Sequence, residues 1–224
     1  MGLVDTFFNL GVVAQTWRLL LSGLQVTILL GLVSIVLGMA GGLAMALARV
    51  YGAPWLRMAA VAYIDVFRAI PLLVLLIVIY YALPFLGIRL SPFAAAAAAL
   101  SLVSCAYAAE IFRAGIEAIP RGQFEAARAL GFHWWPMMRL VILPQAVRIV
   151  VPPLTGNCIN VIKDTALASV VAMPDLLKQA TQAQALAANP TPLILAAAIY
   201  LAILLPLVRL VAMLEARFSE AARR

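Results

Sequence analysis

The sequence predicts an all-α fold in which five membrane-spanning helices form one polytopic bundle across residues 1–224. Hydrophobic residues make up 66% of the chain and charged residues only 11%, whereas soluble domains are about half apolar and a quarter charged. The apolar residues fall in long uninterrupted runs, and many of the charges gather in one island over 110–148. A globule of this size cannot bury so much apolar side chain, so the bilayer must serve as its solvent.

The net charge of +7 fits a membrane protein, because cytoplasmic loops collect Lys and Arg. The basic residues sit at segment ends and form no patch interleaved with aromatics, so we expect no nucleic-acid partner. Cys105 and Cys158 lie in apolar segments, so we expect both to be small residues of the core. His133 is the only histidine, which excludes a multi-histidine metal site.

Each predicted span satisfies the requirement of about 20 apolar residues. Asp65, Arg68 and Pro71 interrupt the second span, and the fourth carries Lys163 and Asp164. The spans are predicted over 19–48, 58–83, 91–112, 150–173 and 190–214, with a cytoplasmic loop over 115–145.

Five spans place the two termini on opposite sides of the membrane. The side richer in Arg and Lys is cytoplasmic by the positive-inside rule, so the N-terminus is expected outside and the C-terminus inside. Residues 175–189 are too polar for a sixth span and predict a helix lying against the outer surface. The expected inner side holds Arg49, Arg57, Arg113, Arg121, Arg128, Arg139, Arg148, Arg217, Arg223 and Arg224, and the outer side holds Arg18, Arg89 and Lys178.

Small residues form ridges on two predicted spans. Ser34, Gly38, Gly42 and Ala46 recur every four positions, and alanines fill 94–99. Small ridges let helices approach closely in lipid, where packing replaces the hydrophobic drive. We therefore expect a tightly packed bundle.

The charged island contains a short predicted helix. Pro120 suits its first turn, and Gly131 supplies a stop after the helix formers from Glu125 to Leu130. About three turns are too few for stability in water, so the helix needs packing partners. Physical reasoning alone leaves open a solvated loop with ordinary surface charges. Two pairs spaced four apart can form ion pairs along a helix face, namely Arg113 with Glu117 and Arg121 with Glu125.

Three blocks of the sequence resemble one transporter family. Glu125-Ala126-Ala127, Gly131 and Leu143-Pro144 match the EAA signature of ABC importer membrane subunits, although that family usually has Ile at the position of Val141. The blocks FRAIPLLVLL from Phe67 and IKDTALASVV from Ile162 occur in the order shown by polar amino acid permeases. The chain is therefore similar, over nearly its whole length, to permease subunits of polar amino acid ABC importers.

The resemblance implies a mechanism and a set of partners. The helix around Glu125 would be a coupling helix that lies in a cleft on a cytoplasmic ABC ATPase dimer. An identical or sister permease subunit and an extracytoplasmic amino acid-binding protein would complete the importer, in the bacterial plasma (inner) membrane. The family handles glutamate, glutamine, basic amino acids, cystine and opines. Coupling is expected to involve Glu125, Ala126, Ala127, Gly131, Leu143 and Pro144.

The chain itself is predicted not to be an enzyme. A Walker loop needs a Lys after Gly, and the only lysines, Lys163 and Lys178, follow Ile and Leu. No catalytic residues, metal site or cofactor are expected here, so ATP and Mg²⁺ would be bound by the partner ATPase.

Ionisable groups in spans are costly and indicate functional positions. Asp65 and Arg68 lie three apart, so they can neutralise each other beside a kink at Pro71. We expect this pair to brace the second span.

The fourth span carries a polar stripe. Asn157, Asn160 and Asp164 follow the i, i+3, i+7 spacing of one helix face, and Lys163 and Thr165 lie beside them. The stripe predicts a lining for the substrate pathway, while Lys163 and Asp164 could instead hold neighbouring helices together.

Other classes of membrane protein fit less well. A secondary transporter is usually longer and built from inverted repeats, and no repeat is visible. A channel component or a purely structural subunit would leave the EAA pattern unexplained.

Overall fold

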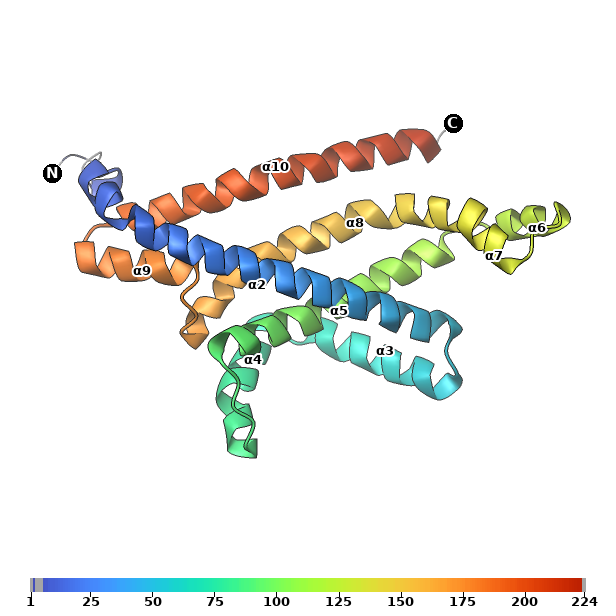
Figure 1. The fold of residues 1–224 in the computed structure, drawn as a ribbon, viewed down its shortest axis with the longest axis horizontal. Coiled ribbons are helices and arrows are strands. Elements are labelled where there is room, and N and C mark those ends of the chain that lie inside the picture. The colour runs from blue at the N-terminus through green and yellow to red at the C-terminus, as the bar shows by residue number, and fades with distance from the viewer. Residues whose placement is uncertain (1, 3–5, 223–224) are drawn as a thin grey trace.

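Long helices lying side by side make up the body of the molecule (Figure 1). The structure is a computed structural model that describes residues 2 and 6–222, with side chains described up to residue 216. Arg217, Arg223 and Arg224, which the orientation argument used, lie outside the described side chains. The long helices are α2 (Leu10–Tyr51), α5 (Pro92–Glu117), α8 (Leu143–Asp164) and α10 (Thr191–Ala222).

Shorter elements connect these helices. They are α3 (Pro54–Ala69), α4 (Leu72–Ile77), the π-helix η1 (Val78–Ala82), the 3-10 helix η2 (Leu83–Leu86), α6 (Arg121–Ala129), α7 (Trp134–Met137), the π-helix η3 (Met138–Ile142), the 3-10 helix η4 (Thr165–Val171) and α9 (Leu176–Ala187). Every regular element in the described part is helical. Four helices there can cross a membrane by length and composition, and five if one bent pair counts as a span. The predicted all-α polytopic class is confirmed.

The small-residue ridge on α2 packs against α5 as predicted. Ser34, Gly38, Gly42 and Ala46 are all buried. A Cβ added to Gly42 would lie 2.6 Å from the Cβ of Ala108 on α5, so only glycine permits this helix separation. The predicted tight packing is confirmed at this interface.

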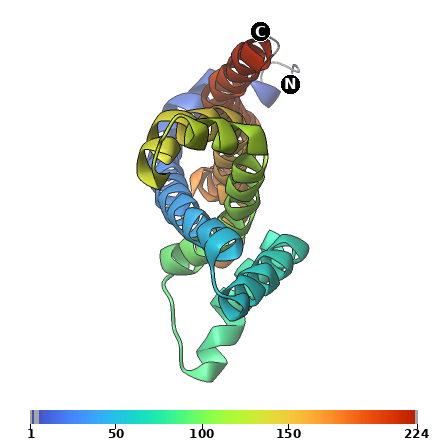
Figure 2. The same ribbon diagram turned by 90° about the vertical axis from the view of Figure 1, so that its right-hand side faces the viewer.

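The second predicted span is not one straight helix, which corrects the expectation for 58–83. Residues Pro54–Ala69 and Leu72–Leu86 form two helical pieces bent by 101°. Pro71 has no N–H to continue the ladder, and Ile70 before it is extended, with φ −77° and ψ 130°. The second piece therefore leaves the bundle as an arm (Figure 2), and Phe85 on that arm is 90% exposed.

The helices containing the first and fourth predicted spans also begin earlier than expected. Helix α2 starts at Leu10, where the side chain of Asn9 accepts a hydrogen bond from Val12 N at 3.2 Å. Helix α8 starts at Leu143 and continues through Pro152 and Pro153. Prolines are tolerated inside membrane helices where neighbouring helices and local adjustments compensate for the lost bonds.

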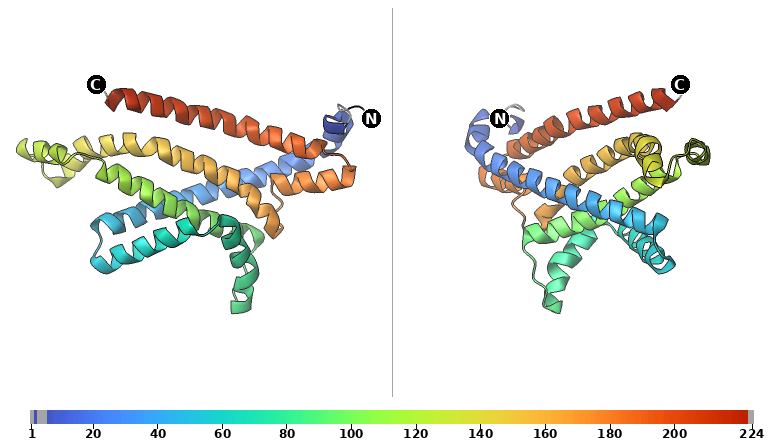
Figure 3. Two further views of the ribbon diagram at one scale, coloured as in Figure 1. Left: turned by 180° about the vertical axis from the view of Figure 1, so that it is seen from behind. Right: turned by 45° about the vertical axis from the view of Figure 1, so that its right-hand side comes forward.

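Residues 175–189 contain the helix that their polarity predicted. Helix α9 buries Leu176, Ala180 and Ala183 along one face, and it packs against α2 and α10. It lies at the end of the bundle opposite α6 and α7 (Figure 3). The bundle therefore has two distinct ends, with short helices at each.

Candidate functional site

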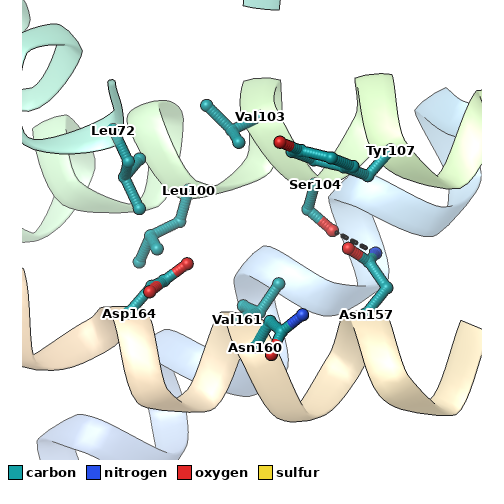
Figure 4. Close-up of a pocket in the computed structure, with 9 residues that line it drawn as sticks. All are labelled: Leu72, Leu100, Val103, Ser104, Tyr107, Asn157, Asn160, Val161 and Asp164. Atoms are coloured by element: carbon teal, nitrogen blue, oxygen red, sulfur yellow. Dashed lines mark hydrogen bonds between the residues drawn. The ribbon is translucent and has the colours of Figure 1, made fainter. Parts of the chain in front are cut away.

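A polar cavity lies between α5 and α8 (Figure 4). It is open to the surface, because Tyr107 and Asn160 in its lining are exposed. Its volume is about 200 Å³. Helix α5 contributes one stripe at positions 100, 103, 104 and 107, and α8 contributes the facing stripe at 157, 160, 161 and 164. The lining residues are Leu72, Leu100, Val103, Ser104, Tyr107, Asn157, Asn160, Val161 and Asp164.

The polar groups of this cavity divide between its two ends. At one end Asn157 Nδ2 donates a hydrogen bond to Ser104 Oγ at 3.1 Å, beside Tyr107 (Figure 4). At the other end lies the carboxylate of Asp164, which has no cation within 4 Å among the described residues. Amides and hydroxyls can donate and accept, whereas a carboxylate only accepts. The cavity is therefore suited to a ligand with both acceptor and donor groups.

The structure brings together the polar stripe predicted on the fourth span but not its neighbours. Asn157, Asn160 and Asp164 all line the cavity. Lys163 is exposed and lies outside the cavity lining, and Thr165 is buried with its hydroxyl donating to Ile162 O at 2.6 Å. Successive helix residues point about 100° apart, so residues adjacent to the stripe turn away from it.

Sequence reasoning missed the α5 half of the cavity. Ser104 and Tyr107 lie three apart within an alanine-rich span, and that spacing is the signal that could have indicated a second polar stripe. Their pairing with α8 depends on how the helices pack, which one sequence does not show.

The ion pair predicted between Asp65 and Arg68 is not formed, which corrects that expectation. Both residues are exposed, and no salt bridge joins them. Instead the guanidinium carbon of Arg68 lies 5.5 Å from the ring centroid of Tyr107. The positive charge is drawn to the face of an aromatic ring on α5, so Arg68 contacts α5 and forms no salt bridge within α3.

Helix α6 forms a second candidate site at one end of the bundle. It ends at Ala129, and Gly131 two residues later has a left-handed φ of 82°. Gly131 N donates to Arg128 O at 2.9 Å and Phe132 N donates to Ala127 O at 3.1 Å. These two bonds define a Schellman motif, so the predicted glycine stop is confirmed.

One face of α6 is buried and the other is free. Ala127 is 2% exposed, in a cluster with Ile119, Met137 and Ile142, while Glu125 and Ala126 are exposed. Leu143 begins α8 directly after η3 and is 45% exposed, and Pro144 lies in the first turn of that helix. The residues of the EAA signature therefore hold the helix in place on one side and present a surface on the other.

An ion-pair network lies where α2 and α5 approach this end. Glu110 binds both Arg49 of α2 and Arg113, the latter at 2.7 Å. Arg113 also pairs with Glu117, as their spacing predicted. The pair predicted between Arg121 and Glu125 does not form within the described chain. The network joins α2 and α5 beside the α6 loop.

Comparison with known proteins places the chain in a transporter family. The family model described as "Binding-protein-dependent transport system inner membrane component" matches residues 34–220. The chain belongs to this family. Its members are transport components of the membrane and not enzymes themselves.

Curated relatives of similar length match most of this chain in sequence. A probable amino-acid ABC transporter permease of Bacillus subtilis (strain 168) is 38% identical over 79% of this chain and 78% of its own length. The arginine transport system permease protein ArtQ of the same organism is 38% identical, over 83% of this chain and 86% of its own. The L-cystine transport system permease protein TcyB of Bacillus subtilis (strain 168) is 40% identical, over 74% of this chain and 71% of its own length.

A solved structure matches the fold over most of this chain. The crystal structure of an amino acid ABC transporter with histidines matches with a TM-score of 0.84 and 38% identity, covering 91% of this chain and 96% of the other. The resemblance drawn from the EAA signature is therefore confirmed at the level of family and fold.

Proposed function

We propose that this chain is the membrane-spanning permease subunit of an ATP-driven ABC importer of polar amino acids, and that it couples to a cytoplasmic ATPase through its 115–145 loop. The relatives named for amino-acid, arginine and cystine transport support this substrate class. Glutamate, glutamine, basic amino acids, cystine and opines are the candidate substrates.

The observation that carries the coupling proposal is the half-buried helix α6. Its inner face packs on Met137 and Ile142, so a force on its outer face is transmitted to the start of α8. Helix α8 carries Asn157, Asn160 and Asp164 of the cavity. Movement of α6 on an ATPase would therefore reach the polar cavity through one continuous helix.

The importer needs further subunits in this proposal. Five spans form half a pathway, so a second permease subunit, identical or a sister, completes it. An ABC ATPase dimer binds ATP and Mg²⁺ on the cytoplasmic side, and an extracytoplasmic binding protein delivers the amino acid. The protein lies in a bacterial plasma (inner) membrane with its N-terminus outside and its C-terminus in the cytoplasm.

The experiment measures ATP hydrolysis by the reconstituted complex with and without loaded binding protein. Gly131→Asp opposes the left-handed turn after α6, and Glu125→Ala changes its exposed face, so both should reduce substrate-stimulated hydrolysis by about tenfold or more. Gly87→Asp is the matched control, because Gly87 has a φ of 83° and open surroundings but follows η2 on the arm. Unchanged stimulation in both α6 variants would refute the coupling role.

A further inference from the structure

An open groove lies at the start of α3, beside the turn that joins this helix to α2. Its volume is about 370 Å³, and Pro54, Arg57 and Met58 in its lining are all exposed. The turn lies toward the same end of the bundle as α6 and α7 (Figures 1 and 3). The proposed function gives this groove no role. The lining residues are Gly52, Pro54, Arg57, Met58 and Val61.

The groove lies where the chain meets a membrane surface. Helix α2 ends at Tyr51 and α3 begins at Pro54, so the turn separates the first two predicted spans, and the positive-inside rule assigns it to the cytoplasmic side. Tyr51 and Trp55 flank the groove, and they are 58% and 68% exposed. Exposed Tyr and Trp side chains of membrane proteins favour the boundary between headgroups and acyl chains. We therefore expect the groove to face lipid at that boundary.

Arg57 gives the groove an uncommitted positive charge. No carboxylate of the described chain lies within 4 Å of its guanidinium, and the first turn of α3 contains no acidic residue. Its Nη2 donates a hydrogen bond to Val50 O at 3.4 Å, which holds the side chain over the turn. A guanidinium has five N–H donors, so most of them stay available. Arg49, in the last turn of α2, is by contrast already bound to Glu110.

The wall beside the guanidinium is apolar. Pro54, Met58 and Val61 contribute only hydrocarbon and a thioether to the lining. Positions 54, 57, 58 and 61 follow the i, i+3, i+4, i+7 spacing of one helix face, so the charge and the apolar wall lie on the same stripe of α3. A free phosphate would bind the charge and leave the apolar wall in water. A phospholipid would cover both.

We propose that this groove binds an anionic phospholipid of the cytoplasmic leaflet, with its phosphate on the Arg57 guanidinium and an acyl chain against Met58 and Val61. The planar fork of a guanidinium matches phosphate in a two-bond geometry, and basic pockets on the cytoplasmic side of membrane helices suit anionic headgroups. A choline headgroup carries its own positive charge beside the phosphate and so competes with the arginine. The groove accordingly prefers phosphatidylglycerol to phosphatidylcholine.

Native mass spectrometry of the assembled permease–ATPase complex tests this proposal. The detergent-purified complex is titrated with phosphatidylglycerol or with phosphatidylcholine of the same acyl chains, and the bound lipids are counted. Wild type should bind phosphatidylglycerol about tenfold more tightly, because charge-assisted hydrogen bonds to the phosphate favour it. Arg57→Gln should reduce this preference to about twofold by removing those bonds. Equal affinity of the wild-type complex for both lipids would overturn the proposal.

Arg148→Gln is the matched control for charge. It removes an exposed arginine that is expected on the same side of the membrane and does not line the groove, so the preference for phosphatidylglycerol should stay at the wild-type value. An equal loss of preference in Arg57→Gln and Arg148→Gln would indicate a general charge effect and would overturn the site.

A second pair of variants tests the apolar wall. Val61→Trp fills the groove without changing its charge and should weaken phosphatidylglycerol binding about fivefold, because less of the acyl chain is buried. Ala62→Trp, at an exposed position outside the lining, should leave binding unchanged. Should Arg57→Gln fail to assemble, unchanged binding in Val61→Trp would still refute the proposal. Displacement of the lipid by millimolar glycerol 3-phosphate would assign the site to soluble phosphates and would be equally contrary.

Discussion

Asp175 is a carboxylate with no exposed surface at the start of α9. Its two oxygens accept hydrogen bonds from Leu177 N at 3.2 Å and Lys178 N at 3.1 Å, so it caps the helix. Burial raises the pKa of Asp175 to about 6 from its ordinary value of 3.8, although the backbone donors oppose this shift. The folded chain therefore binds a proton in a pH range where the unfolded chain has lost it.

Asp175→Asn should flatten the pH dependence of stability. Because the folded pKa is raised, the wild-type free energy of unfolding falls as pH rises from about 4 to about 6 and is level above that. Asn keeps a capping oxygen and does not titrate. The measurement is the Tm of the detergent-solubilised protein between pH 5 and 7.5, with Asp65→Asn as control. Equal slopes in wild type and Asp175→Asn would contradict the assignment.

Asn157→Ala should impair transport through loss of a polar contact in the cavity. The side chain is buried and donates to Ser104, so its removal also leaves that hydroxyl without a donor. A loss of one neutral hydrogen bond predicts a roughly three- to tenfold lower kcat/KM, with a changed order of preference among amino acids. Proteoliposome uptake is the measurement, and Thr155→Val on the same helix is the control. Normal uptake with unchanged preference in both Asn157→Ala and Asn160→Ala would exclude this lining.

The close contact between α2 and α5 depends on a glycine at position 42. A Leu side chain at position 42 would collide with Ala108, which a Cβ alone would approach to 2.6 Å. Gly42→Leu should therefore destabilise the protein by about 1–3 kcal/mol or more, as overpacking does. Ala44→Leu, at an exposed position on the same helix, should change the free energy of unfolding little. Thermal unfolding in detergent compares the two, and equal Tm values would show that the helices can separate without cost.

The α2 ridge was predictable because its information is local. Four small residues at one spacing define one helix face, whatever that face contacts. The glycine after α6 was predictable for the same reason, since a left-handed stop needs only its own residue. Features that depend on one segment's own geometry can thus be derived from a single sequence.

The arm after Pro71 shows where such reasoning ends. Residues 58–83 are apolar enough for a span. Hydropathy depends only on composition, however, and does not predict the direction in which the helix runs. Pro71 permits a bend without specifying its size, and only packing around the arm produces 101°. The residues that face the α8 stripe were missed for a related reason. Ser104 lies 53 residues before Asn157 in the sequence, and only the packing of α5 against α8 brings the two together.

The molecule as a whole has its proposed working surfaces at opposite ends. Helices α6 and α7 lie at one end and α9 lies at the other (Figure 3). Helix α8 runs from the α6 end toward the α9 end and carries the cavity on the way. In the proposed importer, the α6 end faces the cytoplasm, where ATP is available, and the α9 end faces the binding protein.

A single cysteine at Ala129 tests this orientation. Ala129 is exposed on α6, in a loop whose arginines predict a cytoplasmic location. In a background with Cys105→Ala and Cys158→Ala, Ala129→Cys should resist a membrane-impermeant maleimide in intact spheroplasts and react in inverted vesicles. Thr181→Cys, exposed on α9, should show the opposite pattern. Labelling of Ala129→Cys from outside would place the coupling loop away from ATP and end the importer proposal.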